Sequence, residues 1–357
     1  MTGKYMSIDR IWVLSRSLLG ALILAPSLQA QPASSPQDPL FADDSQLEIT
    51  LRGPFEELDQ KRDKTATYPK GTLSYLDGDE IVNIGTSFLP RGNFRLKKEN
   101  CQHAQLWLEL KKKHVRRTLF AKQKKLKLVV QCRDSKRYQS YLRKEFQAYR
   151  MLNQLTDLSY RVRWVEVTFQ NLEGETLRRQ PAFFIEHKDR LAKRLDAKIV
   201  NKPHIAKTEL DPEQATMMSL FNYFIGNADY SLISSKEGSC CHNAKLFLRS
   251  PGTSYLPVIY DFDSSGYVSA PYAITPAQLN LRSVRQRLYR GFCVEDDVFE
   301  RALEQFQMQR ESLLAIATET EFVGRRTAKK GVSYLEGFYD VMENPKQLNR
   351  KVLDVCR

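Results

Sequence analysis

Three small groups of Asp and Asn residues lie between positions 221 and 273, each beside an apolar run. The first is Gly226-Asn227-Ala228-Asp229, the second is His242-Asn243, and the third is Asp261-Phe262-Asp263. Carboxylate and amide oxygens of this kind are the ligands that Mg²⁺ takes together with the phosphates of a bound nucleotide. We therefore predict that the three groups meet at one site that handles phosphate.

The position of each group in the sequence predicts a different role for it at such a site. Asp229 follows an apolar helical pattern and lies in a turn, where a carboxylate can accept the proton of a hydroxyl nucleophile. Asn243 precedes a second apolar segment, and Asp261 and Asp263 follow the apolar segment Leu256–Tyr260. Any one of these residues alone also fits an ordinary turn or helix cap. The prediction therefore depends on the ordered set.

The elements that must position these residues fall into two parts. Residues 46–186 alternate like strands around one amphipathic helix, Tyr138–Leu155, and residues 187–357 are mainly helical. Asp211-Pro212 begins a helix that ends at Gly226-Asn227. The other expected elements are strands at 46–55, 81–88, 105–110, 126–132, 161–169 and 181–185, and helices at 276–290, 295–319 and 332–354.

The first 45 residues are expected to lie outside the fold. Residues 1–30 place two arginines before the apolar run Leu18–Ala25, which is too short to span a bilayer, and end on a small residue suited to cleavage. This pattern predicts a signal peptide, with an uncleaved anchor as the alternative. Residues 31–45 are rich in Gln, Pro and Ser and predict a flexible leader. We therefore expect an exported protein, periplasmic or extracellular, with no transmembrane anchor after signal cleavage.

Six cysteines follow this segment: Cys101, Cys132, Cys240, Cys241, Cys293 and Cys356. An even number behind a signal peptide predicts disulfides. We pair Cys101 with Cys132, which flank a basic segment, and Cys293 with Cys240 or Cys241, and leave Cys356 unassigned. A zinc site at Cys240-Cys241-His242 is disfavoured because adjacent cysteines rarely bind one zinc ion.

The net charge of +13 favours acidic partners such as nucleotide phosphates, anionic polymers or acidic proteins. Basic residues gather in the runs 111–117 and 122–127. No aromatic residues interleave within these runs to stack on bases. The sequence therefore favours a solvated hairpin over a nucleic-acid partner.

The segments that carry this chemistry resemble a known family. G-N-A-D, H-N-A-K-L and Y-D-F-D-S-S-G are most similar to the CotH-type spore-coat kinases of the protein-kinase-like superfamily, and more distantly to HipA-like kinases. R-G-N-F-R at 91–95 is similar to an R-G-N-S segment that CotH-type proteins carry near the nucleotide. L-K-L-V with R-K-E-F-Q-A-Y resembles the lysine strand and the helix after it, and F-F-I-E-H-K-D-R-L resembles the strand that leads into the hinge. The resemblance covers residues 45–275 in outline.

The resemblance implies an α+β, bilobal protein-kinase-like fold. A β-rich N-lobe with one helix would span 46–186 and a mainly helical C-lobe 187–357. ATP with Mg²⁺ or Mn²⁺ would bind between them. The implied roles are Asp229 as catalytic base, Asn243 and Asp261 as metal ligands, Lys127 at the α/β-phosphates with Glu145 as its partner, Arg91 and Arg95 near the phosphates, and Glu186 at the adenine edge.

The chain also departs from typical kinases. It has no G-x-G-x-x-G loop and no H-R-D triad, and fourteen positions separate Asp229 from Asn243 where typical kinases have five. Asp263 stands where a typical metal loop has Gly, so it is either a second metal ligand or a turn cap. These departures make the chemistry a weaker inference than the fold.

The sequence thus predicts an exported kinase-like phosphotransferase that acts on a protein or a small hydroxyl acceptor. The alternative is a catalytically inactive nucleotide-binding or scaffold module. A metal-dependent hydrolase fits less well because the five histidines are scattered. A serine hydrolase is disfavoured because there is no G-x-S-x-G. Neither the acceptor nor the choice between phosphoryl and nucleotidyl transfer follows from the residues.

Overall fold

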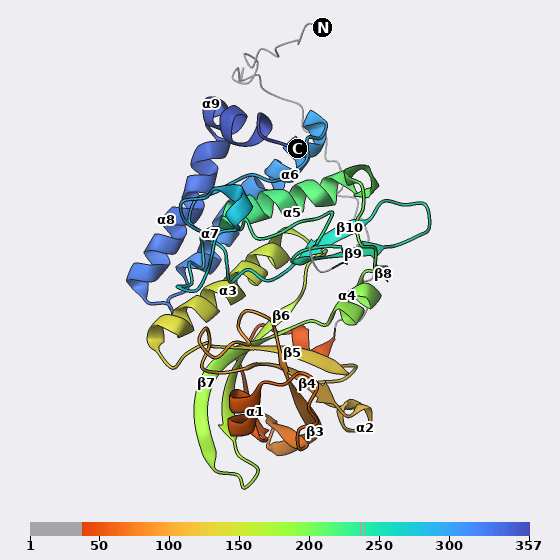
Figure 1. Ribbon diagram of the computed structural model, residues 1–357, viewed down its shortest axis with the longest axis vertical. Coiled ribbons are helices and arrows are strands. Elements are labelled where there is room, and N and C mark those ends of the chain that lie inside the picture. The colour runs from red at the N-terminus through yellow and green to blue at the C-terminus, as the bar shows by residue number, and fades with distance from the viewer. Residues whose placement is uncertain (1–37, 236–237, 239) are drawn as a thin grey trace, which may run out of the picture. The chain divides into compact units, whose positions relative to one another are not determined.

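The computed structural model describes residues 38–235, 238 and 240–357, and the first large element in it is a β-barrel (Figure 1). Seven strands close in the order β1-β2-β3-β4-β5-β7-β6. Neighbouring strands run antiparallel except β1 and β6, which run parallel. The strands are β1 Leu47–Arg52, β2 Gly71–Asp77, β3 Glu80–Arg91, β4 Gln105–Leu110, β5 Lys125–Val130, β6 Val162–Gln170 and β7 Thr176–Ile185.

The alternation of side chains along the strands builds the core of the barrel. Successive residues of a strand point to opposite faces. In β5, Leu126 and Leu128 are fully buried, whereas Lys127 between them is partly exposed on the other face. In β1, Ile49 and Leu51 are buried in the same way. These four apolar side chains belong to the core of the barrel.

This closed barrel contradicts the predicted bilobal protein-kinase-like fold with its β-rich N-lobe, and that prediction is wrong. The decisive contact is the parallel pairing of β1 with β6, from Leu47 opposite Val165 to Arg52 opposite Gln170. It joins the two ends of the sheet and leaves no open edge. The sequence analysis also missed β2. Two strands so far apart in the chain can pair although nothing in the sequence of either strand predicts the pairing.

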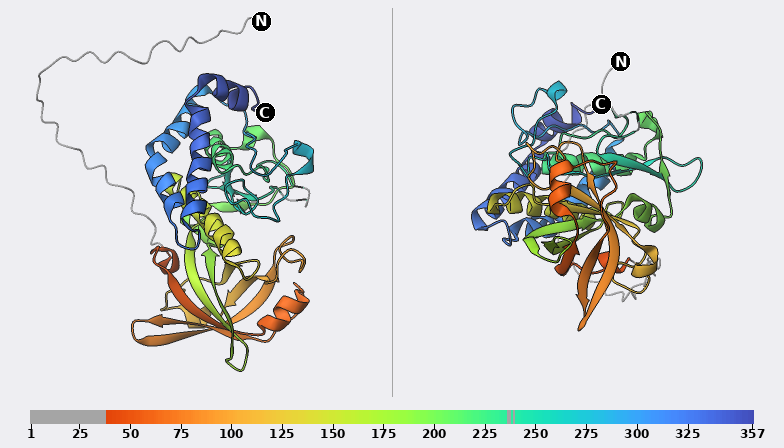
Figure 2. Two further views of the ribbon diagram at one scale, coloured as in Figure 1. Left: turned by 90° about the vertical axis from the view of Figure 1, so that its left-hand side faces the viewer. Right: turned by 60° about the horizontal axis from the view of Figure 1, so that its bottom comes forward.

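A second hydrophobic core lies among the helices. It contains residues of α3, of β6 and β7, and of the later helices, and Figure 2 shows α3 between the barrel strands and those helices. The helices are α1 Phe55–Lys61, α2 Lys112–Val115, α3 Lys136–Leu155, α4 Lys188–Arg194, α5 Pro212–Ile225, α6 Asp296–Met308, α7 Arg310–Thr318, α8 Arg325–Met342 and α9 Pro345–Leu348. A small antiparallel sheet of order β10-β9-β8 is formed by β8 Lys198–Val200, β9 Ala244–Leu248 and β10 Leu256–Ile259. Short 3₁₀ turns occur at Pro39–Phe41, Lys207–Glu209 and Ala277–Leu279, and a π-helical turn at Asn349–Leu353.

Some of the predicted helices are confirmed and others are wrong. Helices α3 and α5 are confirmed, and the Asp211 side chain caps α5 by accepting a hydrogen bond from the Gln214 amide. The long helix expected at 295–319 is two helices that meet at Gln309. The helix expected at 276–290 is wrong, since only the 3₁₀ turn Ala277–Leu279 forms there.

The predicted signal peptide, 1–30, and residues 31–37 of the predicted leader lie outside the described residues. From Asp38 onward the chain packs on the barrel. Leu40 is fully buried, and Arg190 donates a hydrogen bond of 2.8 Å to the Asp38 carboxylate. This part of the segment 31–45 is therefore ordered. None of the described helices is long and apolar enough to cross a bilayer.

All six cysteines form pairs at disulfide distance. Cys101 pairs with Cys132, as predicted. Cys240 pairs with its neighbour Cys241, and Cys293 pairs with Cys356. The predicted pairing of Cys293 with Cys240 or Cys241 is therefore wrong, because the main chain brings residue 293 to the C-terminal segment, where its amide donates to the Arg357 carbonyl.

Gly226 ends α5 in a left-handed conformation with φ of +65°. A Cβ at this position would overlap the hydroxyl oxygen of Tyr334. Left-handed backbone costs a non-glycine residue roughly 1–2 kcal/mol, and overpacking adds about 1–3 kcal/mol. We expect Gly226→Ala to lower the free energy of unfolding by about 2–5 kcal/mol, measured by urea denaturation.

Gly252 provides the matched control. Its φ is +83°, and no atom lies within 4 Å of an added Cβ. Gly252→Ala therefore tests the backbone cost alone, about 1–2 kcal/mol. Equal losses in the two variants would show that Tyr334 does not restrict the turn after α5.

Candidate functional site

A cavity of about 420 Å³ lies between the outer face of the barrel and the segment that follows α5. Seven of the nine predicted site residues line it: Arg91, Arg95, Lys127, Asp229, Asn243, Asp261 and Asp263. The first three come from the barrel strands or the loop after β3, and the other four from the three Asp/Asn groups. The structure thus brings together residues that are far apart in the sequence.

The hairpin of β9 and β10 aligns two of the three groups. Ala244 lies opposite Ile259, and the Tyr260 amide donates a hydrogen bond of 3.0 Å to the Asn243 carbonyl. Asn243 ends one side of the hairpin with φ of +51°, and Asp261 leaves the other side with φ of +68°. Asn and Asp tolerate this left-handed conformation better than most residues. The two side chains therefore reach the cavity from adjacent strand ends.

Asp229 is held by hydrogen bonds on both carboxylate oxygens. His242 Nε2 lies 2.8 Å from Oδ1, and Asn243 Nδ2 lies 3.2 Å from Oδ2. Asn243 Nδ2 also donates to the Asp229 carbonyl at 2.8 Å. Arg290 donates to the carbonyls of Ala228 and Tyr230, on either side of Asp229. The orientation of this carboxylate is thus fixed from several directions.

Arg95 forms the centre of a buried ion-pair network. Its guanidinium contacts Glu145 at 3.2 and 3.3 Å, Asp263 at 3.2 Å and Asp261 at 3.4 Å. Burial alone would lower the pKa of Arg95, but the carboxylates of Asp263 and Glu145 raise it well above its ordinary value. Burial raises the pKa of Asp263 to about 7, in spite of Arg95. Glu145 is thus the partner of Arg95, where the sequence analysis expected Lys127.

Lys127 and Arg91 are the cations less engaged by carboxylates. Lys127 Nζ lies 5.8 Å from the centre of the Trp107 ring and 5.1 Å from that of Tyr260. Burial, followed by the nearby Arg91, lowers the pKa of Lys127 from 10.5 to about 7. Burial and the adjacent Arg95 lower the pKa of Arg91 to about 10. Both groups would regain a favourable environment beside a phosphate, because a nearby anion stabilises the charged form.

Glu186 lies outside the cavity. Its carboxylate accepts hydrogen bonds from Arg194 at 2.9 and 3.2 Å and from the Arg161 amide at 3.1 Å. The side chain is buried, and these partners account for both of its oxygens. Its position indicates a structural role at the end of β7. Its assignment to the adenine edge of a nucleotide site stays a prediction of the resemblance.

The cavity offers a partial set of ligands for a divalent cation. The Asn243 amide nitrogen is used on Asp229, which leaves its amide oxygen as the atom that can bind a cation. The Asp261 side chain is 44% exposed, while that of Asp263 is 11% exposed and paired with Arg95. Among the described residues, no three His, Cys, Asp or Glu side chains are grouped to hold a metal ion. The arrangement fits Mg²⁺ or Mn²⁺ only if phosphate oxygens and water complete the shell, as is usual for Mg²⁺.

Sequence reasoning missed two residues of the site. His242 stands directly before Asn243, and the motif H-N-A-K-L contained it, yet only a weak zinc interpretation was considered. Nothing in the sequence around Arg290 predicted its role, because that role depends on the fold, which brings residue 290 close to the turn around Asp229. The sequence did allow His242 to be predicted, because it is adjacent to the candidate ligand Asn243 and must lie near it in the fold.

No protein-family model matches this chain, and no curated protein is found to be similar to it in sequence. The resemblance to CotH-type kinases therefore stands on the quoted motifs alone.

The lowered pKa of Lys127 predicts a pH-dependent stability. Between pH 7 and 10.5 the unfolded chain holds a proton on this amine that the folded chain has released. The free energy of unfolding therefore rises with pH in this range, by at most about 1.4 kcal/mol per pH unit. Lys127→Met lacks this titration. The stability of wild type relative to this variant should increase from pH 7 to 10, measured by urea denaturation.

Lys125→Met is the matched control on the same strand, where the Lys125 amine pairs with Glu109 at 3.3 Å. This variant should keep the rise with pH that wild type shows. A difference between wild type and Lys127→Met that stays constant over the range would mean that Lys127 is fully charged in the folded protein.

Proposed function

We propose that this protein is an exported phosphotransferase that uses ATP with Mg²⁺ or Mn²⁺ and acts on a hydroxyl group of a protein or a small molecule. The observation that carries the proposal is the cavity of about 420 Å³, where cations from the barrel face Asp229, Asn243 and Asp261. The similarity of the three motifs to those of CotH-type kinases supports it. The proposal concerns the chemistry alone and includes no kinase-like fold.

The two sides of the cavity suit different parts of a nucleoside triphosphate bound with a metal ion. Arg91 and Lys127 present positive charge for phosphate oxygens. Asn243 and Asp261 would hold the metal ion, which would neutralise negative charge on the phosphates. Arg95 is already bound by carboxylates, so its part is to fix Asp261 and Asp263. The assignment of Asp263 as a metal ligand is accordingly the weaker one.

Asp229 is the group that can accept a proton. In the transfer, the acceptor oxygen forms a bond to the γ-phosphorus, and the bond from phosphorus to the β–γ bridging oxygen breaks. The bridging oxygen keeps the electron pair, so ADP leaves, and the hydroxyl proton passes to an Asp229 oxygen. Phosphoryl transfer depends mainly on positioning and charge stabilisation. The contacts of His242 and Asn243 with Asp229 supply that positioning.

Export is supported by the three cysteine pairs at disulfide distance, since disulfides persist in oxidising compartments. A periplasmic or extracellular location raises the question of the donor, because ATP is scarce there. The site itself favours a triphosphate only through its charge. The identity of the nucleotide is therefore one of the quantities to be measured.

A second candidate is a catalytically inactive nucleotide-binding or scaffold module. One observation favours it: both oxygens of Asp229 already have hydrogen-bond partners, His242 and Asn243. A base in this state must exchange one of these contacts for the acceptor hydroxyl. Turnover separates the two candidates, because both predict that nucleotide binds.

The decisive experiment supplies ATP labelled at the γ- or the α-phosphate, with Mg²⁺ or Mn²⁺ and candidate acceptors. We expect label from the γ-phosphate alone. Asp229→Asn should keep nucleotide binding and lower kcat about 10²–10⁴-fold, the usual contribution of general base catalysis. Asp261→Ala should abolish metal-dependent nucleotide binding, measured by calorimetry with and without the metal.

Asp340→Ala removes an exposed carboxylate of α8 and serves as the control, with unchanged binding and rate. Transfer from the α-phosphate would replace the proposed reaction by nucleotidylation. Binding without transfer in any condition would identify the inactive module. Full activity of Asp229→Asn would show that the base is assigned wrongly.

A further inference from the structure

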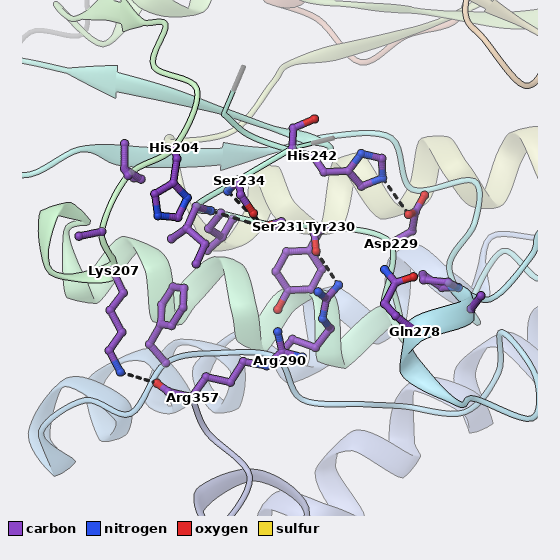
Figure 3. Close-up of a pocket in the computed structure, with 18 residues that line it drawn as sticks. His204, Lys207, Asp229, Tyr230, Ser231, Ser234, His242, Gln278, Arg290 and Arg357 are labelled. Carbon is purple, nitrogen blue, oxygen red and sulfur yellow. Dashed lines mark hydrogen bonds and ion pairs between the residues drawn. The ribbon is translucent and has the colours of Figure 1, made fainter. Parts of the chain in front are cut away.

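A second, larger cavity adjoins the first. Its volume is about 880 Å³, and it shares Asp229, Ser235 and His242 with the smaller cavity among the residues that line each. Figure 3 shows Asp229 and His242 together at one end of it. The carboxylate proposed to accept the proton is therefore accessible from both cavities. The proposed donor site uses only the smaller one.

The larger cavity is positively charged. Lys207, Arg290 and Arg357 line it, and Asp229 is the only acidic side chain among its described lining residues. No carboxylate side chain of the described residues forms an ion pair with any of the three cations. The Lys207 amine donates a hydrogen bond of 2.9 Å to the main-chain oxygen of Arg357, which holds these two residues next to each other. Figure 3 shows them at the end away from Asp229, with Arg290 between.

The walls of the cavity suit an extended chain better than an enclosed small molecule. Phe292 and Ile233 offer partly buried apolar surface, and Ser231 and Ser234 offer hydroxyl groups. Exposed residues occur at both ends. They are His204, Ala206 and Lys207 at the basic end, and Ala277 and Gln278 in the 3₁₀ turn next to Asp229. Residues exposed to solvent at both ends are what the binding of an extended polypeptide would require.

We propose that this cavity binds an acidic polypeptide segment and presents one of its Ser or Thr hydroxyls to Asp229. Carboxylates of the segment, placed some residues from the hydroxyl, pair with Lys207 and Arg357. This proposal rests on the proposed phosphotransferase function and names its acceptor. The hydroxyl oxygen takes the γ-phosphoryl group of ATP, its proton goes to Asp229, and ADP is released. Opposite charge at such a surface gives specificity more than raw affinity.

The first test measures binding alone, by fluorescence anisotropy with the full chain. One labelled peptide carries a single Ser between Asp and Glu residues, and its isostere replaces these by Asn and Gln. We expect the acidic peptide to bind about tenfold more tightly. The double variant Lys207→Gln/Arg357→Gln should lose about five- to tenfold in affinity for the acidic peptide and none for the isostere.

The matched control is Arg326→Gln/Lys329→Gln, which removes the same two charge types from exposed positions of α8. Its affinity for the acidic peptide should stay at the wild-type value. Equal affinity for the two peptides, or an equal loss in the control variant, would overturn the proposal. Displacement of the peptide by free phosphoserine at a concentration equal to the peptide Kd would also overturn it, because the occupant would then be a small molecule.

The second test adds γ-labelled ATP and metal to the same peptides. We expect label on the acidic peptide, with KM raised and kcat retained in Lys207→Gln/Arg357→Gln. Transfer to the isostere with equal kcat/KM would refute the acidic acceptor and leave the phosphotransferase function standing. Selective binding of the acidic peptide without any transfer would refute the phosphotransferase function and leave the binding site standing.

Discussion

The guanidinium of Arg95 contacts Glu145 on α3 and both aspartates that follow β10, and this buried network joins the barrel to the rest of the site. Arg95 belongs to the loop between β3 and β4, so three separate parts of the chain depend on one side chain. Removing one member of a buried ion pair leaves an uncompensated charge, which costs about 3–5 kcal/mol. We therefore expect the loss of one member of this network to disturb the wall of the cavity.

Helix α3 supports the network from one face. Glu145 and Tyr149 are four residues apart, so they lie one above the other on the helix. Glu145 holds Arg95, and the Tyr149 hydroxyl accepts a hydrogen bond of 2.9 Å from the Asp261 amide. The fully buried Phe262 packs on Tyr149 with ring centres 4.6 Å apart. This anchor fixes the backbone between the two aspartates, so that Asp261 is the more exposed of the two in the cavity and Asp263 is the closer to Arg95.

The sequence predicted most strands because their apolar alternation is a local pattern, and it predicted the meeting of the three polar groups because each group stands beside an apolar segment. Leu126 and Leu128 around Lys127 mark a strand wherever that strand lies. The closure of the barrel could not be predicted in this way, because the pairing of β1 with β6 depends on two segments that only the complete fold brings together. The partner of Glu145 was missed for the same reason. The charges in the sequence do not show whether the Lys127 amine or the Arg95 guanidinium lies closer to the Glu145 carboxylate.

The two cavities share Asp229, Ser235 and His242, and their other lining residues differ. A donor in one cavity therefore need not depart before an acceptor enters the other. For the proposed transfer, this arrangement implies a ternary complex with direct transfer in place of a phosphorylated enzyme intermediate. ADP would then compete with ATP for the smaller cavity. An unreactive acceptor analogue would occupy the larger cavity and would not compete with ATP. The steady-state inhibition patterns of the two compounds therefore reflect the separation of the cavities.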